Sequence, residues 1–140
     1  MNEQAETPEI MPAQSPAPVA ASAELPPKEV EDGKAFAILS YAAGFIGVPF
    51  FIVPLIMRNN TYSLYHAKQC LMLWIVGVIA GSVAGFSMLL CIGFILLPIV
   101  GITMLVLDVM GLINALNGQM KPLPVIGKWG ENWFKGITKA

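Results

Sequence analysis

The chain has 140 residues, of which 56% are hydrophobic and only 12% are charged, about half the charged fraction of a typical soluble domain. A chain of this size has too little interior to bury so much apolar surface. This argues against a soluble enzyme, a nucleic-acid-binding protein and a disulfide-stabilised secreted module. The composition predicts a small all-α integral membrane protein.

The N-terminal quarter differs in composition from the rest. Residues 1–32 contain seven acidic residues and one lysine, a net charge of −6, and six of the eleven prolines. Residues 33–140 contain seven basic and two acidic residues, a net charge of +5. We expect a disordered acidic tail rich in Pro and Ala over residues 1–33, followed by a membrane domain over 34–140. A docking tail for a protein partner is the alternative.

The first apolar segment covers residues 35–57 and contains no charged residue. As a helix, its 23 residues extend for about 35 Å, enough to span a bilayer with some tilt. Pro49 and Pro54 lie in its second half, where they are expected to kink the helix or end it early.

The second apolar segment, residues 71–107, has 37 residues, or about 56 Å as a helix, nearly twice the thickness of a bilayer core. The chain must therefore turn back within it. We expect helices over about 68–90 and 97–117 and a turn over 91–96, with Gly93 and Pro98 as its breakers. Thr61 or Ser63 is the expected N-cap of the first of these helices.

Basic residues predict the orientation of this three-span arrangement. The loop 58–68 and the C-terminal tail together hold six of the eight Lys and Arg residues. By the positive-inside rule, both face the cytoplasm, and the N-terminus lies outside the bacterial inner membrane. A fourth span or a re-entrant segment would reverse one end.

The C-terminal segment, about 124–138, has the pattern of an amphipathic helix. At 100° per residue Lys128 and Lys135 fall on one side, and Trp129 and Trp133 cluster on the other. We expect this helix to lie in the headgroup plane and to contact anionic lipid at the basic cytoplasmic face. Packing of both Trp residues against the bundle is the alternative.

Glycines recur every fourth residue in the second expected span, at Gly77, Gly81 and Gly85. Such a stripe lets two helix backbones approach closely within lipid. It favours a homo-oligomer or, equally, packing within one chain.

Asp108 is the polar residue expected inside the membrane, in the third span. Intramembrane carboxylates usually face the protein interior, because exposure to lipid costs about 2.5–3.5 kcal/mol. Two interpretations stay open. Asp108 either holds the bundle together through a hydrogen bond to Ser40 or Ser82, or acts as an ionisable pore or ligand residue.

No pattern of catalytic residues is present. The sequence has no phosphate-binding loop, serine-nucleophile motif, zinc-ligand pair or carboxylate dyad. His66 is a lone histidine, and neither Cys70 nor Cys91 has the context of a disulfide or metal ligand. We therefore expect no enzymatic activity, no cofactor, no metal site and no nucleic-acid partner.

Three stretches carry a family resemblance. They are the residues 39–41, the box Tyr65, His66, Ala67, Lys68 and Gln69, and the segment 111–127 that includes Asn114, Gly118, Pro124 and Gly127. In order and spacing they resemble a bacterial family of small membrane proteins, distantly similar to the Tic20-like chloroplast import component. That family includes the MamF/MmsF-like magnetosome membrane proteins. The resemblance covers roughly residues 36–130 and implies an inner-membrane protein, associated in the magnetosome members with magnetite crystal growth.

Two functions follow from these observations. The first is a non-enzymatic scaffold or assembly factor that oligomerises in the bilayer, favoured by the glycine stripe. The second is a pore or translocon-like transport subunit, favoured by Asp108 and the kinked first helix.

Overall fold

The computed structural model describes residues 25–140, and every regular element in that part of the chain is a helix. In chain order these are α1 (Pro27–Phe45), α2 (Ile52–Met57), α3 (Thr61–Phe86), the short 3-10 helix η1 (Ser87–Leu90), α4 (Gly93–Leu116) and α5 (Ile126–Trp133). Residues 1–24 of the expected tail lie outside the described residues. Its last residues differ from the expectation, because the chain is helical from Pro27.

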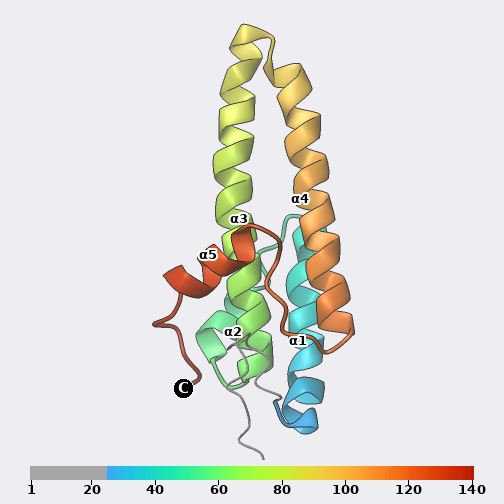
Figure 1. Cartoon of the computed structure of the whole chain (residues 1–140), viewed down its shortest axis with the longest axis vertical. Helices are drawn as coiled ribbons and strands as arrows, with labels where there is room; N and C mark the ends of the chain where they lie inside the picture. Colours follow the sequence, from blue (N-terminus) through green and yellow to red (C-terminus); the bar gives the residue numbers. More distant parts are fainter. Residues whose placement is uncertain (1–24) are drawn as a thin grey trace, which may run out of the picture.

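The two long helices α3 and α4 form an antiparallel hairpin whose tip extends well beyond the other elements (Figure 1). Both are long and apolar enough to cross a membrane, and they are the two such helices in residues 25–140. The apolar run turns back at Cys91 and Ile92, with Cys91 in the left-handed region (φ 61°). Gly93 packs directly on the backbone of Ala84 and Met88, so a side chain there would overlap it. Pro98 lies inside α4 rather than in the turn.

The first apolar segment differs from the single helix expected over 35–57. α1 ends at Phe45, the chain turns through residues 46–51, and α2 then runs for six residues. Pro49 lies in the turn and Pro54 in the first turn of α2, where a missing N–H is tolerated. The segment 35–57 therefore runs along α3 in one direction, turns, and returns beside the end of the hairpin away from its tip. It does not form a third long helix.

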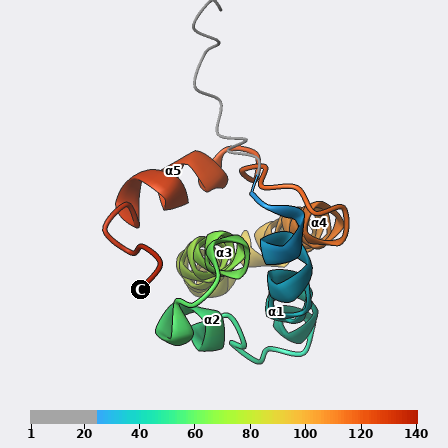
Figure 2. The same cartoon turned by 90° about the horizontal axis from the view of Figure 1, so that it is seen from below.

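The base of the molecule is built around α3. Figure 2 shows α1, α2 and α5 arranged around its N-terminal part, and each of the three contacts it. A main cluster of buried side chains joins α1, α3 and α4, with Ala37, Tyr41, Tyr62, Ala67 and Ala115 at its centre. A second cluster, which includes Met72, Leu123 and Ile126, fixes α5 and the residues 121–125 before it.

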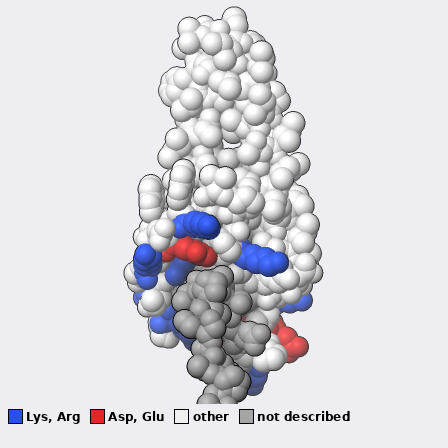
Figure 3. Space-filling model, viewed as in Figure 1, with Lys and Arg blue, Asp and Glu red and all other residues white. Residues whose placement is uncertain are grey.

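Charged residues lie in the half of the molecule away from the hairpin tip (Figure 3). Between Gln69 and Leu107 the chain has no Lys, Arg, Asp or Glu. The start of α1 and the C-terminal tail also meet in the charged half, because the Lys139 ammonium lies 3.0 Å from the Glu29 carboxylate. The turn after Phe45 brings the chain back along α3, which allows this contact. The expectation that the two ends lie on opposite sides of the membrane stays a prediction.

Candidate functional site

An aromatic box encloses His66 at the base of the hairpin. The imidazole is fully buried. The rings of Tyr41, Tyr62 and Tyr65 meet it edge-on, with centroid distances of 5.8, 4.8 and 5.4 Å. Tyr62 and His66 are one helical turn apart on α3, whereas Tyr41 reaches the box from α1.

Both ring nitrogens of His66 have partners. Nε2 lies 3.0 Å from the carbonyl oxygen of Gln119, which can only accept, so Nε2 carries the proton. Nδ1 then accepts from the Tyr41 hydroxyl at 3.3 Å. His66 thus acts as a neutral link between α1, α3 and the segment after α4. Neither nitrogen can bind a metal unless one of these bonds breaks.

The segment after α4 reaches His66 because the chain turns at Gly118. Gly118 adopts a φ of +70°, which favours glycine, and the Gln119 N–H bonds the Asn114 carbonyl oxygen at 2.9 Å. This turn directs the Gln119 carbonyl towards the imidazole. One turn earlier, the Tyr62 hydroxyl donates to the Ala115 carbonyl oxygen at 2.8 Å, which satisfies an end carbonyl of α4.

Gln69 holds the segment that leads into α5. Its buried amide donates to the Gly127 carbonyl oxygen and accepts from the Leu123 N–H, both at 3.4 Å. Gly127 must lack a side chain here, since a Cβ would lie 2.8 Å from the Gln69 Oε1 and 2.7 Å from the Pro122 carbonyl carbon. The exposed Pro124 lies between these two contacts, and its carbonyl oxygen accepts from the Ile126 N–H at 2.7 Å.

α5 lies against α3 through its small residues. Gly130 faces Met72, and the Tyr65 hydroxyl donates to the Glu131 carboxylate at 2.8 Å. Ile126 is buried, whereas Trp129 and Trp133 are 53% and 70% exposed. Lys128 and Lys135 are exposed as well, and Lys68 is half-buried. Packing of both tryptophans on the bundle is therefore not observed.

Several polar contacts join the start of α1 to the start of α3. Asn60, and not Thr61 or Ser63, is the N-cap of α3, and its side chain accepts from the Ser63 N–H at 2.9 Å. Glu29 accepts from the Thr61 N–H at 2.9 Å and pairs with Lys139. These bonds, above all the one from the Thr61 backbone, lower the pKa of Glu29 from 4.5 to about 2.

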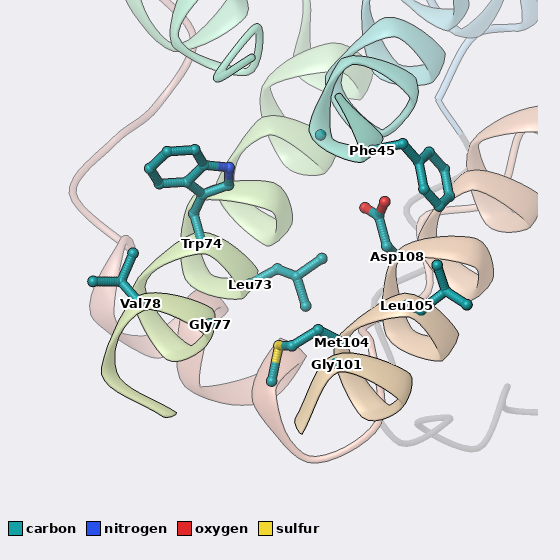
Figure 4. A pocket seen from close by; sticks show the side chains of 10 residues that line it. Phe45, Leu73, Trp74, Gly77, Val78, Gly101, Met104, Leu105 and Asp108 are labelled. Atoms are coloured by element: carbon teal, nitrogen blue, oxygen red, sulfur yellow. The ribbon is translucent and has the colours of Figure 1, made fainter. Parts of the chain in front are cut away.

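Asp108 lines a cleft between the end of α1 and the facing sides of α3 and α4 (Figure 4). The cleft has a volume of about 360 Å³, and its other lining residues are apolar or glycine. The carboxylate points towards the end of α1 and is half-buried. Ser40 donates to the Phe36 carbonyl oxygen instead of to Asp108, so the expected bond between them is not formed. Within residues 25–140 no basic side chain pairs with Asp108.

The three glycines of α3 have different surroundings. A Cβ at Gly77 would meet Met104 of α4 at 3.7 Å, so this glycine belongs to the packing within the chain. At Gly81 and Gly85 nothing lies within 4 Å of the Cβ position. These two glycines therefore have no packing neighbour at their Cβ positions within residues 25–140.

Residues 65–69 and the segment 111–127, which carry the family resemblance, thus come together in one network of hydrogen bonds and close contacts. His66, Gln69, Asn114, Gly118 and Gly127 all contribute to it. A family model described as the magnetosome magnetite crystal formation protein family, MamF/MmsF, matches residues 32–130. The chain belongs to this family.

Membership and the two long apolar helices identify a membrane protein of the MamF/MmsF family, as the resemblance indicated. Neither the curated proteins nor the solved structures contain a match to this chain. The similarity to the Tic20-like component stays a prediction.

The sequence reasoning missed several residues of the network. Glu29, Asn60 and Gln119 were not singled out, because their partners are 31 or more positions away in the chain or are backbone atoms. Tyr62 could have been found, since it lies four residues before His66 and therefore shares its helix face.

Proposed function

We propose that α3 and α4 form the transmembrane part of the protein and that α1 and α2 form a re-entrant pair beside it. The position of α5 supports this. α5 contacts α3 at Met72, and the 18 residues from there to Leu90 extend for about 27 Å at 1.5 Å per residue. This length is close to the roughly 30 Å of a bilayer core, so α5 and the hairpin tip lie at opposite interfaces.

The charge distribution supports one orientation. All eight Lys and Arg residues lie outside the uncharged stretch 69–107 that forms the upper hairpin. The positive-inside rule therefore puts the whole charged base in the cytoplasm and the tip, Ser87–Ile92, on the opposite side. In this topology the exposed Trp129 and Trp133 lie at the level of the interface belt, with Lys128 and Lys135 close to anionic headgroups.

Within this topology the protein acts as a non-enzymatic scaffold or assembly factor. The carrying observation is that His66 and Gln69 of the family motif bond to Tyr41 and to backbone groups, which leaves neither of them aimed at a substrate. Large apolar residues cover the exposed upper hairpin, and Gly81 and Gly85 allow close approach there. A second copy of the chain is the proposed partner of this face.

The family description suggests the setting for such a scaffold, a membrane that encloses a growing magnetite crystal. The proposed tip, Ser87–Ile92, carries no carboxylate to bind iron. The protein is therefore proposed to organise the membrane or its other proteins and not to template the mineral. Deletion is expected to change crystal size, and a tip variant such as Met88→Ala is expected to restore wild-type crystals.

Gly81→Ile tests the oligomeric scaffold. Within residues 25–140 nothing lies within 4 Å of the Cβ position at Gly81, so the monomer is expected to fold, while close helix contact is blocked. Chemical crosslinking in membranes is expected to show loss of the oligomer at wild-type abundance. The matched control is Val83→Ile, an exposed position of α3 that already carries a β-branched residue. Equal crosslinking of Gly81→Ile and the wild type would contradict the proposal.

A pore or transport subunit is the second candidate, and Asp108 in its cleft favours it. Cation flux into vesicles that contain the purified protein, abolished in Asp108→Asn, would support this candidate. Vesicles with no flux above the protein-free background leave the scaffold as the better proposal.

A further inference from the structure

The cleft beside Asp108 has a polar end and an apolar end. Asp108, Gly44 and Phe45 lie at the end nearer the charged base, and Gly77, Val78 and Gly101 lie nearer the hairpin tip. Because α4 rises about 1.5 Å per residue, Asp108 is about 22 Å from the tip at Gly93 and Gly101 is about 12 Å from it. The carboxylate is thus close to the cytoplasmic interface, while the glycines lie near the bilayer centre.

The geometry points to a site for an amine-bearing phospholipid of the cytoplasmic leaflet, with its ammonium on Asp108 and the start of an acyl chain over Gly77 and Gly101. The polarity of the cleft matches the polarity of such a lipid. The inference rests on the membrane topology proposed above and goes beyond the scaffold role.

Charge complementarity argues for an ammonium group. The Asp108 carboxylate has no basic partner within residues 25–140, and an unpaired carboxylate close to hydrocarbon is costly. A primary ammonium carries three donors and can bond the carboxylate. Figure 4 shows the Phe45 ring beside the carboxylate, where its face can also attract a cation.

Glycines in the lining of the cleft leave room for this ligand. A Cβ at Gly44 would lie 3.7 Å from both oxygens of Asp108 and would narrow the approach to the carboxylate. At Gly101 nothing lies within 4 Å of the Cβ position, so the cleft is open there. Its volume of about 360 Å³ is at the lower end of that of small-molecule sites and fits part of a lipid but not a whole one.

The test uses the full chain in nanodiscs made from equal parts of phosphatidylethanolamine and phosphatidylglycerol, followed by native mass spectrometry of the lipids that stay bound. The wild type is expected to retain phosphatidylethanolamine in preference to phosphatidylglycerol. Asp108→Asn is expected to weaken this retention about tenfold, the loss expected for one charge-assisted hydrogen bond. Asp32→Asn, which removes an exposed carboxylate in the charged base, is the matched control and is expected to retain the lipid.

A second variant tests the apolar end. Gly101→Leu adds a side chain to the lining of the cleft at a position whose Cβ has nothing within 4 Å, so it is expected to fold and to lose the bound lipid. Ile102→Leu, at an exposed position next to it, is expected to behave as the wild type. The melting temperature of each variant in detergent shows whether the chain is folded.

Three outcomes would overturn the inference. They are equal lipid retention in the wild type and Asp108→Asn, a preference for phosphatidylglycerol, and a disulfide between two copies of the Gly101→Cys variant, which would put a second chain in the cleft. None of these readouts depends on which side of the membrane the tip occupies, so a failure here is distinct from a failure of the topology.

Discussion

Gly111 is the position in α4 where the approach of α1 leaves no room for a side chain. A Cβ there would overlap the ring of Tyr41, which is itself fixed by His66. Gly111→Ala is expected to lower the free energy of unfolding by about 1–3 kcal/mol, because overpacking outweighs the gain of about 1 kcal/mol in helix propensity. Thermal unfolding in detergent measures this change.

Gly101→Ala is the control for this prediction in the same helix. Its Cβ meets no atom within 4 Å, so only the propensity gain remains and the variant is expected to be as stable as the wild type or more stable. Equal stability of Gly111→Ala and Gly101→Ala would show that α1 does not pack on α4 as described.

Glu29 gives the stability of the base a defined pH dependence. The bonds from Thr61 and Lys139 lower its pKa from 4.5 to about 2 in the folded chain. A depressed folded-state pKa means that the carboxylate stabilises the fold above pH 4.5, and that this contribution is lost as the pH falls from 4.5 to 2. Unfolding of the wild type and Glu29→Gln at several pH values in this window is expected to show a smaller pH dependence for the variant.

Glu31 provides the control, because it is an exposed carboxylate in the same helix and forms no ion pair in the described residues. Glu31→Gln is expected to follow the wild-type pH dependence. A wild-type profile for Glu29→Gln would mean that the contact between α1, α3 and the C-terminal tail is absent in solution.

At the scale of elements, the buried amide of Gln69 is one of the groups that hold α5 on α3. Gln69→Leu removes the donor to Gly127 and the acceptor of Leu123, and each unsatisfied backbone group costs about 1–3 kcal/mol. The segment 121–133 is therefore expected to detach from α3, and trypsin is expected to cleave after Lys128 faster than in the wild type. Asn132→Leu, which changes an exposed amide of α5, is expected to leave the cleavage rate unchanged.

The hydrophobic pattern carries different amounts of information for different elements. A run of 37 apolar residues is too long for one crossing, so a turn near Cys91 follows from bilayer thickness alone. The end of α1 at Phe45 does not follow from hydrophobicity, since the next residues are equally apolar, but an early end was expected from Pro49 and Pro54. The return of the chain along α3 was not predicted, because contacts such as Tyr41 on His66 and Gly111 join residues far apart in the sequence.

The candidate site shows the same division. The family motif indicated His66, Gln69 and Gly127 as a group, and the structure explains the group through two backbone contacts, one to Gln119 after α4 and one to Gly127 in α5. The surroundings of Asp108 were open to sequence reasoning only in part. Its place in the third expected span indicated an intramembrane carboxylate, whereas the contribution of α1 to the cleft needed the turn after Phe45.

The whole molecule has a natural probe of its topology, because one of its two cysteines lies at the hairpin tip. Cys91 is exposed between η1 and α4, whereas Cys70 is buried at the base of α3. In the proposed orientation Cys91 alone is open to the non-cytoplasmic side. A membrane-impermeant maleimide added to spheroplasts, which keep the cytoplasm sealed, is expected to label the wild type and to leave Cys91→Ser unlabelled. Reporters fused at either end of the chain are expected to be cytoplasmic, because Glu29 and Lys139 meet in the charged base. Labelling of Cys91 only after the membrane is permeabilised would reverse the orientation. A reporter at the N-terminus that is active outside the cytoplasm would show instead that the segment 35–57 crosses the bilayer, and the re-entrant pair would then be wrong.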